Sequence, residues 1–290
     1  MAQCAHPLEV PNKTKDMYDQ NLMMNVPCGK CINCLKRRAS DWSFRLQQEV
    51  KASSSACFLT LTYENPPTTD LGYHTLKKRD FQTFLKRLRK LVPIKMETVK
   101  GKQVNVNKLK YYACGEYGTK TQRPHYHAVL FNLPHRIISS PEQISDTWQN
   151  GHIHIANNNI KTINYVVGYM QKQGMVKLRK DDNRKPEFSL MSKGLGNAYL
   201  TPQMIQYYRK RKLFCITKEE GHIISMPRYY KNIIYSKEEL SELYQIWLDE
   251  YNYDFLQDWE LSKIEREKVE QQKAKQYQHD KQLKLNRITL

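Results

Sequence analysis

Two histidines one residue apart, His125 and His127, have the type and spacing of metal ligands. In a β-strand alternate side chains face the same way, so the two imidazoles would lie about 7 Å apart along the chain, with Tyr126 on the opposite face. If residues 117–124 form a hairpin loop, Glu116 pairs with His125, whereas a slip of one residue would set it against Tyr126. Two imidazoles and one carboxylate suit Mg²⁺ or Mn²⁺ with open positions for a phosphate oxygen. The alternative is a pair of exposed strand histidines with an unrelated glutamate.

A second H-x-H sequence, His152 and His154, also lies in a segment with strand character. No hairpin partner with a carboxylate is evident for it. We therefore interpret these two histidines as ordinary strand residues, and separate substitution of the two pairs would show which one supports metal-dependent activity.

Two tyrosines, Tyr165 and Tyr169, are spaced i and i+4, so on a helix both phenols would lie on one face. A tyrosyl oxygen can attack a phosphodiester, but with an ordinary pKa near 10 it needs a metal to make the phosphate more electrophilic. Lys172, three residues further on, could neutralise the attacking phenolate or the phosphate. The alternative is that both tyrosines are core aromatics.

Three cysteines follow a C-x-x-C-x-x-C pattern: Cys28, Cys31 and Cys34. A structural zinc ion needs a fourth ligand, which Cys4 or His6 could supply, and free thiols are the alternative. An iron–sulfur cluster of the ferredoxin type is disfavoured because Arg38 stands where a fourth cysteine is needed. The remaining cysteines are in apolar settings and are expected to be small buried residues: Cys57, Cys114 and Cys215.

Hydrophobic periodicity predicts the elements that must position these residues. Helices are expected at 40–50, 76–92, 141–149 and 161–173, and strands at 57–63, 108–116, 125–131 and 152–155, while residues 1 to about 40 are expected to be irregular. Strands with interspersed helices, rather than strict βαβ alternation, favour an α+β fold with an antiparallel sheet.

The net charge of +18 points to a polyanion partner, most simply nucleic acid. Residues 237–270 hold 11 acidic and 4 basic residues and so contribute −7, which leaves +25 on the rest of the chain. Basic residues on the 76–92 helix are candidate phosphate contacts, with a merely solvated surface as the alternative: Lys86, Arg87 and Lys90. No apolar run approaches the roughly 18 residues of a membrane span, and no secretory signal is evident, which excludes an integral membrane protein and disfavours a secreted disulfide scaffold.

The order of these motifs resembles that of the HUH endonucleases that initiate rolling-circle replication, and the Y-x-x-x-Y pair resembles their two-tyrosine class. Over residues 1 to about 235 the chain is more specifically similar to the replication initiators of gokushoviruses, a branch of the microviruses. That similarity rests on the cysteine pattern at 27–34, on Gly115-Glu-Tyr-Gly118 before the H-x-H, and on Pro227-Arg-Tyr-Tyr-Lys231. Gly168 stands where relatives often have lysine, which puts a role for a lysine between the tyrosines in doubt.

The resemblance implies a split βαβ, ferredoxin-like sheet with flanking helices, the metal strand in its middle and the tyrosine helix alongside. It implies three regions: a cysteine-containing segment at 1–50 packed on the core, an endonuclease domain at 51–235, and a charged helical tail at 236–290. It also implies DNA contacts near the nick from three residues: Thr60, Thr62 and Arg123.

The implied activity is metal-dependent nicking of origin DNA in the duplex form of a circular phage genome, through a 5′-phosphotyrosine link, followed by rejoining without ATP. The implied setting is the cytoplasm of a bacterial host. No Walker-type phosphate loop is present in the sequence, so a host helicase is the expected partner. Two other functions remain open: a non-catalytic binder of single-stranded nucleic acid, and a relaxase or transposase with the same site.

Overall fold

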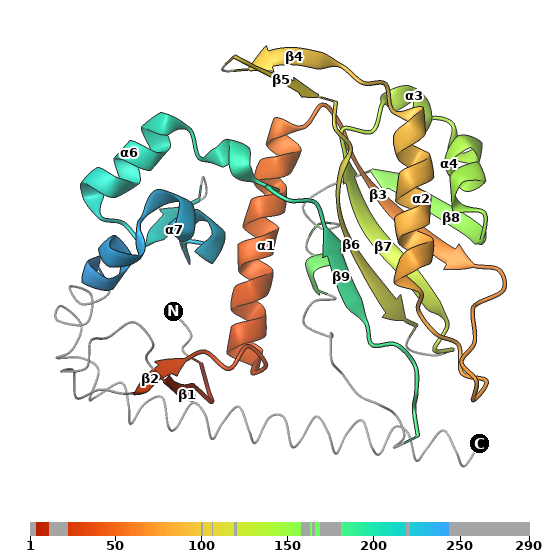
Figure 1. The fold of residues 1–290 in the computed structure, drawn as a ribbon, viewed down its shortest axis with the longest axis horizontal. Helices are drawn as coiled ribbons and strands as arrows, with labels where there is room; N and C mark the ends of the chain where they lie inside the picture. Colours follow the sequence, from red (N-terminus) through yellow and green to blue (C-terminus); the bar gives the residue numbers. More distant parts are fainter. Residues whose placement is uncertain are drawn as a thin grey trace. The chain divides into compact units, whose positions relative to one another are not determined.

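A computed structural model describes most of the first 243 residues of the chain (Figure 1). The described ranges are 4–11, 23–99, 101–105, 107–118, 121–157, 163, 166–168, 181–218 and 221–243. The chain divides into two compact units, residues 1–228 and residues 229–290. Within the described ranges no helix is both long and apolar enough to span a bilayer. Tyr165, Tyr169, Lys172 and almost all of the acidic tail lie outside the described residues.

A five-stranded antiparallel sheet forms the centre of the first unit (Figure 1). Its strand order is β8 (Gly151–Asn157), β3 (Ala56–Tyr63), β7 (Pro124–Phe131), β6 (Lys110–Tyr117) and β9 (Phe188–Met191). The predicted α+β class with an antiparallel sheet is confirmed, and the H-x-H strand, β7, is the central one as expected. The edge strand β9 was not predicted, because its four residues are too few to show an alternating pattern.

One face of the sheet is covered by α2 (Lys78–Leu91), α3 (His135–Ile138) and α4 (Pro141–Trp148). The buried residues there include Leu59, Leu61 and Tyr126 from the strands, with Phe84 and Trp148 from the helices. The apolar spacing of α2 therefore marks the side on which it packs, as the sequence predicted, although the helix is slightly shorter than expected.

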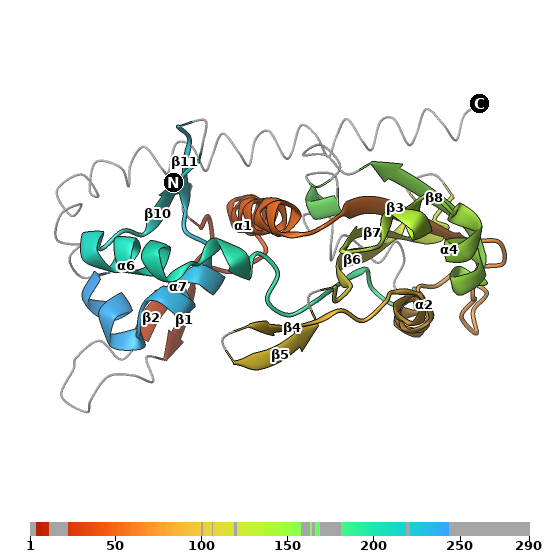
Figure 2. The same ribbon diagram turned by 90° about the horizontal axis from the view of Figure 1, so that it is seen from above.

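The opposite face is covered by α1 (Ile32–Ala52), so that α1 and α2 lie on different sides of the strands (Figure 2). Leu46 of α1 packs there with Phe58 and Val129. The side chain of Glu49 is buried at this contact, where it accepts hydrogen bonds from Lys110 Nζ at 2.6 Å and from the Gly196 amide at 2.8 Å. The helix is thereby attached to the sheet by polar as well as apolar contacts.

The prediction that residues 1 to about 40 are irregular is wrong. A short hairpin of β1 (Leu8–Pro11) and β2 (Met23–Val26) occupies this region, and α1 begins at Ile32, eight residues before the predicted start. The first turns of α1 contain Lys36, Arg37 and Arg38 in place of an apolar stripe, so their helical state depends on surroundings that periodicity does not reveal.

Tyr126, between the two histidines, points into the apolar cluster beneath α2. Its hydroxyl donates to the Lys77 carbonyl at 2.8 Å, accepts from the Lys77 amide at 3.1 Å, and lies 2.7 Å from the hydroxyl of Tyr63. Burial raises the pKa of Tyr126 to about 12, so the hydroxyl stays protonated at neutral pH. This anchoring fixes which face of β7 the histidines occupy.

Shorter elements complete the described chain. They are the hairpin β4 (Met96–Val99) and β5 (Lys102–Asn105), the 3-10 helix η1 (Asn197–Tyr199), α6 (Pro202–Arg211), the hairpin β10 (Cys215–Thr217) and β11 (Ile223–Ser225), and α7 (Arg228–Ile234). A sharp turn before β8 requires Gly151, which has φ +143° and whose hypothetical Cβ would clash with the Glu64 amide nitrogen.

Candidate metal centre

Glu116, His125 and His127 converge on the sheet face that α1 covers. Glu116 pairs directly with His125 across the β6–β7 hairpin, in the register that the sequence predicted rather than the slipped one. The Oε2 atom of Glu116 lies 3.5 Å from His125 Nε2 and 3.6 Å from His127 Nε2. Glu116 and His127 are each only 5% exposed, whereas the side chain of His125 is 19% exposed. The group therefore opens to solvent on the His125 side.

Hydrogen bonds at the far side of each imidazole orient the two rings. His125 Nδ1 lies 3.1 Å from the Arg123 carbonyl oxygen, which can only accept, so this nitrogen is the donor. His127 Nδ1 lies 3.1 Å from Thr60 Oγ1. A neutral ring protonated at Nδ1 has a lone pair at Nε2, and both Nε2 atoms face Glu116. Such outer hydrogen bonds are typical of metal-binding histidines.

The three ligand atoms lie within 4.8 Å of one another, close enough to bind one cation. Adjacent ligands in an octahedron around Mg²⁺ are about 3 Å apart, so a small inward movement of the side chains would complete coordination. One carboxylate and two neutral imidazoles leave positions for water or a phosphate oxygen. The chemistry of this donor set fits a divalent cation.

The second H-x-H shares the face of the first. Thr60 pairs with His127 on one side and with His154 on the other, and Thr62 pairs in the same way with His125 and His152. His152 and His154 are exposed and stand two strands from the first pair, which corresponds to about 10 Å. They are therefore too far from Glu116 to bind the same ion. Their shared face was not evident from the sequence, because the β3–β8 pairing joins distant segments.

The predicted DNA contacts do not all gather at this face. Thr60 and Thr62 lie on it, between the two histidine pairs. Arg123 lies at the hairpin end, where its guanidinium donates to the carbonyl oxygens of Tyr63 and Glu64. The basic residues of α2 lie with their helix on the other side of the sheet: Lys86, Arg87 and Lys90.

The four cysteines of the N-terminal pattern form a second group, with Cys4 rather than His6 as the fourth member: Cys4, Cys28, Cys31 and Cys34. Of the others, Cys57 and Cys114 are buried, as the sequence predicted, and Cys215 is partly buried.

Comparison with known proteins gives consistent results. The family model for the replication-associated protein ORF2 matches residues 56–174, a range that includes the triad and both candidate tyrosines. Replication-associated protein ORF2 of Spiroplasma virus 4 is 28% identical, over 98% of this chain and 95% of that protein. Replication-associated protein VP4 of Bdellovibrio phage phiMH2K is 29% identical, over 71% of the chain and 66% of that protein. Replication-associated protein ORF4 of Chlamydia phage 1 is 25% identical, over 72% and 53%. No solved structure matches the chain significantly.

Proposed function

Because the chain is related to the replication-associated proteins of these phages, as its motifs predicted, we propose that it is the endonuclease that initiates rolling-circle replication of a circular phage genome. It nicks the origin strand, remains joined to the 5′ end through a tyrosine, and later rejoins the strand. The observation that supports this most directly is the triad of Glu116, His125 and His127, with both imidazoles oriented by their Nδ1 hydrogen bonds.

The nucleophiles in this proposal are Tyr165 and Tyr169. Support comes from their described neighbours, because Ile163, Val166 and Val167 belong to the apolar cluster on the same sheet face as the triad. A helix that buries those three residues on this face brings its phenols within reach of a phosphate held beside His125, the exposed member of the triad.

The chemical step is a transesterification. The phenol oxygen of one tyrosine attacks the phosphorus, the bond to the 3′ oxygen breaks, and the phenol proton passes to the solvent while the leaving oxygen takes up a proton as a 3′-OH. Bound between the three ligands, Mg²⁺ or Mn²⁺ would withdraw charge from the phosphate oxygens. Lys172 supplies positive charge near the phenolate.

The second tyrosine allows the strand to be closed after one round of synthesis. It cleaves the regenerated origin, and the released 3′-OH then attacks the first phosphotyrosine, so that the displaced strand is circularised. Each step exchanges one phosphodiester for another, which is why no ATP is needed.

The DNA strand near the nick is proposed to cross β3, where Thr60 and Thr62 face the same side as the triad. Arg123 supports this edge by holding the hairpin to the end of β3, and its charge lies close to the expected path. The basic residues of α2 remain candidates for phosphate contacts away from the nick, since they are on the other side of the sheet. Unwinding of the duplex in the host cell is assigned to a host helicase.

Formation of a covalent adduct tests the proposal. The full chain is incubated with single-stranded oligonucleotides tiling the circular DNA that encodes it, with Mn²⁺, Mg²⁺ or excess EDTA. We expect an SDS-stable protein–DNA band with one oligonucleotide, which requires the metal and is absent in the double variant Tyr165→Phe, Tyr169→Phe. The matched control is Tyr207→Phe, Tyr229→Phe, which removes two phenols elsewhere and should still form the band.

DNA binding without an adduct under any metal would overturn the nuclease proposal and leave a single-strand binder. An adduct that persists in the tyrosine double variant would reassign the nucleophile. Specific cleavage of transfer or transposon ends, without cleavage of the tiled genome, would identify a relaxase or transposase instead.

A further inference from the structure

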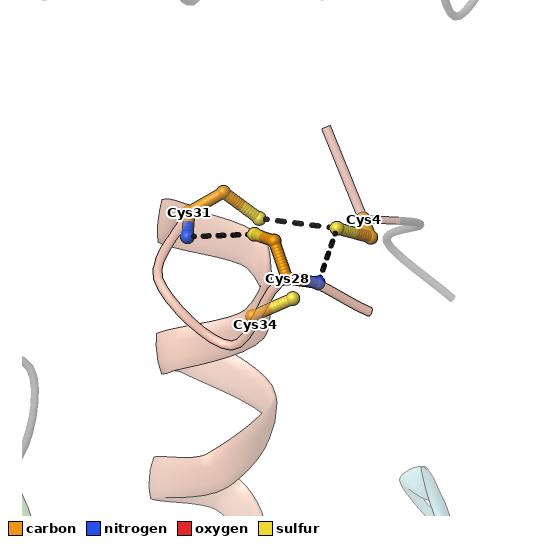
Figure 3. A group of neighbouring side chains, drawn as sticks. All are labelled: Cys4, Cys28, Cys31 and Cys34. Carbon is orange, nitrogen blue, oxygen red and sulfur yellow. Dashed lines mark hydrogen bonds between the residues drawn. The ribbon is translucent and has the colours of Figure 1, made fainter. Parts of the chain in front are cut away.

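The N-terminal cysteine group lies apart from the proposed active site and has the dimensions of a metal-binding site. Cys4 precedes β1, Cys28 follows β2, Cys31 is the residue before α1, and Cys34 lies in the first turn of α1 (Figure 3). All four Sγ atoms lie within 4.8 Å of one another, and those of Cys4 and Cys31 are 3.8 Å apart. Sulfurs at about 2.3 Å from a tetrahedral zinc ion are separated by about 3.8 Å. The thiols are free, and that separation is far longer than the roughly 2 Å of a disulfide.

Backbone amides surround the sulfurs in the way expected for bound thiolates. The Cys28 amide donates to Cys4 Sγ at 3.2 Å, and the amides of Lys30 and Cys31 donate to Cys28 Sγ at 3.4 and 3.3 Å (Figure 3). Gly29, with φ +73°, gives the turn a left-handed residue that lets both amides face the same sulfur. Hydrogen bonds to a sulfur stabilise its negative charge and orient it as a ligand.

Positive charge near the sulfurs further favours thiolates. The group lies at the N-terminus of the 21-residue helix α1, whose partial positive charge attracts anions. Arg38 approaches the same turn, with Nη2 at 3.5 Å from where a Cβ on Gly29 would lie. Four thiolates around a divalent ion have a net charge of −2, which the helix end and this guanidinium would partly balance.

From these contacts we propose that Cys4, Cys28, Cys31 and Cys34 bind one structural Zn²⁺. Four thiolates fill the tetrahedron and leave no open position, so the ion is not catalytic. A multinuclear iron–sulfur cluster would hold its four thiolates around a larger core, farther apart than the observed sulfurs. Zinc is the divalent ion that combines thiolate preference, tetrahedral geometry and absence of redox chemistry.

The ion connects the extreme N-terminal segment to α1. The two β-strands between Cys4 and Cys28 have four residues each, and such a hairpin is only marginally stable by itself. Because α1 continues from the zinc site to Glu49 and the sheet, the ion would secure the N-terminal hairpin to a helix that is already packed on the catalytic domain. Metal binding would thus supply folding energy that the short strands lack.

Metal analysis of the full chain tests the proposal independently of nuclease activity. Protein purified under reducing conditions without chelators should contain about one zinc per chain. Single variants Cys4→Ser and Cys34→Ser should lose most of it, whereas Cys215→Ser, a cysteine outside the group, should keep it. The variant Glu116→Gln, His125→Ala should also retain zinc, which separates this site from the triad. Cobalt(II) exchanged into the wild-type protein should give the intense visible bands of a tetrahedral thiolate site.

A second measurement does not depend on the folding of the variants. Titration of the wild-type protein with a mercurial reagent should release zinc as the accessible thiols react, with the β1–β2 amides gaining hydrogen exchange while those of β7 remain protected. Absence of zinc and of cobalt bands in reduced, folded protein would overturn the proposal. Stoichiometric iron with cluster absorbance, or a Cys28–Cys31 disulfide in protein kept reduced, would overturn it as well.

Discussion

Glu116 lies directly opposite His125 in the β6–β7 hairpin, with its Oε2 atom 3.5 Å from the imidazole Nε2. The pair brackets the hairpin loop, so that one turn of the chain unites an anionic and a neutral ligand. Each histidine also has its Nδ1 hydrogen bond, from which the metal affinity of the site should be separable.

Removal of the carboxylate charge should abolish most metal binding. Glu116→Gln keeps the size of the side chain but replaces an anionic oxygen, so we expect Mn²⁺ affinity to fall at least about tenfold, with a parallel fall in adduct formation. Isothermal titration with Mn²⁺ measures the first effect. The double variant His152→Ala, His154→Ala is the matched control on the same face, and it should bind Mn²⁺ as the wild type does. A loss of affinity in the control equal to that in Glu116→Gln would contradict the assignment of ligands.

Thr60 should act through His127 rather than on the metal itself. Thr60→Val is nearly isosteric but removes the hydroxyl 3.1 Å from Nδ1, so the ring loses one orienting bond and Mn²⁺ affinity should fall by about tenfold. Thr62→Val, one pair further along β3, should leave Mn²⁺ affinity unchanged and weaken DNA binding instead. Equal effects of both variants on Mn²⁺ binding would argue against this division.

Alkaline pH should destabilise the fold through Tyr126. Its pKa is about 12 in the folded protein because of burial, against about 10 when unfolded, so the unfolded chain loses the proton first. The stabilisation is complete below about pH 10 and is lost as the pH rises from about 10 to about 12. Urea denaturation across this range measures it. Tyr126→Phe should be less stable than the wild type by about 1 kcal/mol at neutral pH, with the difference shrinking above about pH 10. A constant difference would refute the titration.

Substitution of Gly151 should be costly for steric reasons. A Cβ there would clash with the Glu64 amide nitrogen and lie 2.5 Å from the Thr62 carbonyl oxygen, and both are backbone atoms that cannot rotate away. We expect Gly151→Ala to lower the free energy of unfolding by about 3 kcal/mol. Gly72→Ala, at φ +79° with no neighbour within 4 Å, should show the conformational cost alone, about 1 kcal/mol. Similar losses for both variants would show that the clash is relieved. Thermal unfolding followed by circular dichroism gives both values.

The local pattern of the sequence was sufficient to predict the ligand strand. Alternation places His125 and His127 on one face and Tyr126 on the other, and a short hairpin has few registers to choose from, so the pairing of Glu116 followed from the loop length. The main strands and the amphipathic helix α2 were predicted for the same reason, since their periodicity is local.

What the sequence did not reveal depends on contacts between distant segments. His152 and His154 share a face with the triad only because β8 pairs with β3, about ninety residues earlier in the chain. The basic stripe of α2 was recognisable, but not the side of the sheet on which that helix packs. The early start of α1 was missed because its first turns are polar, and their surroundings come from the residues before β1 and after β2.

The hairpin loop is closed by its own hydrogen bonds, from the Gly118 amide to the Arg123 carbonyl at 3.0 Å and from the Gln122 amide to the Gly118 carbonyl at 2.9 Å. Both neighbouring ligands, Glu116 and His125, belong to the ladder that precedes this closure. The length and composition of the loop are therefore decoupled from the spacing of the ligand atoms. Evolution or engineering can vary the loop, and with it the surface presented beside the ion, while the chemistry of the site stays constant.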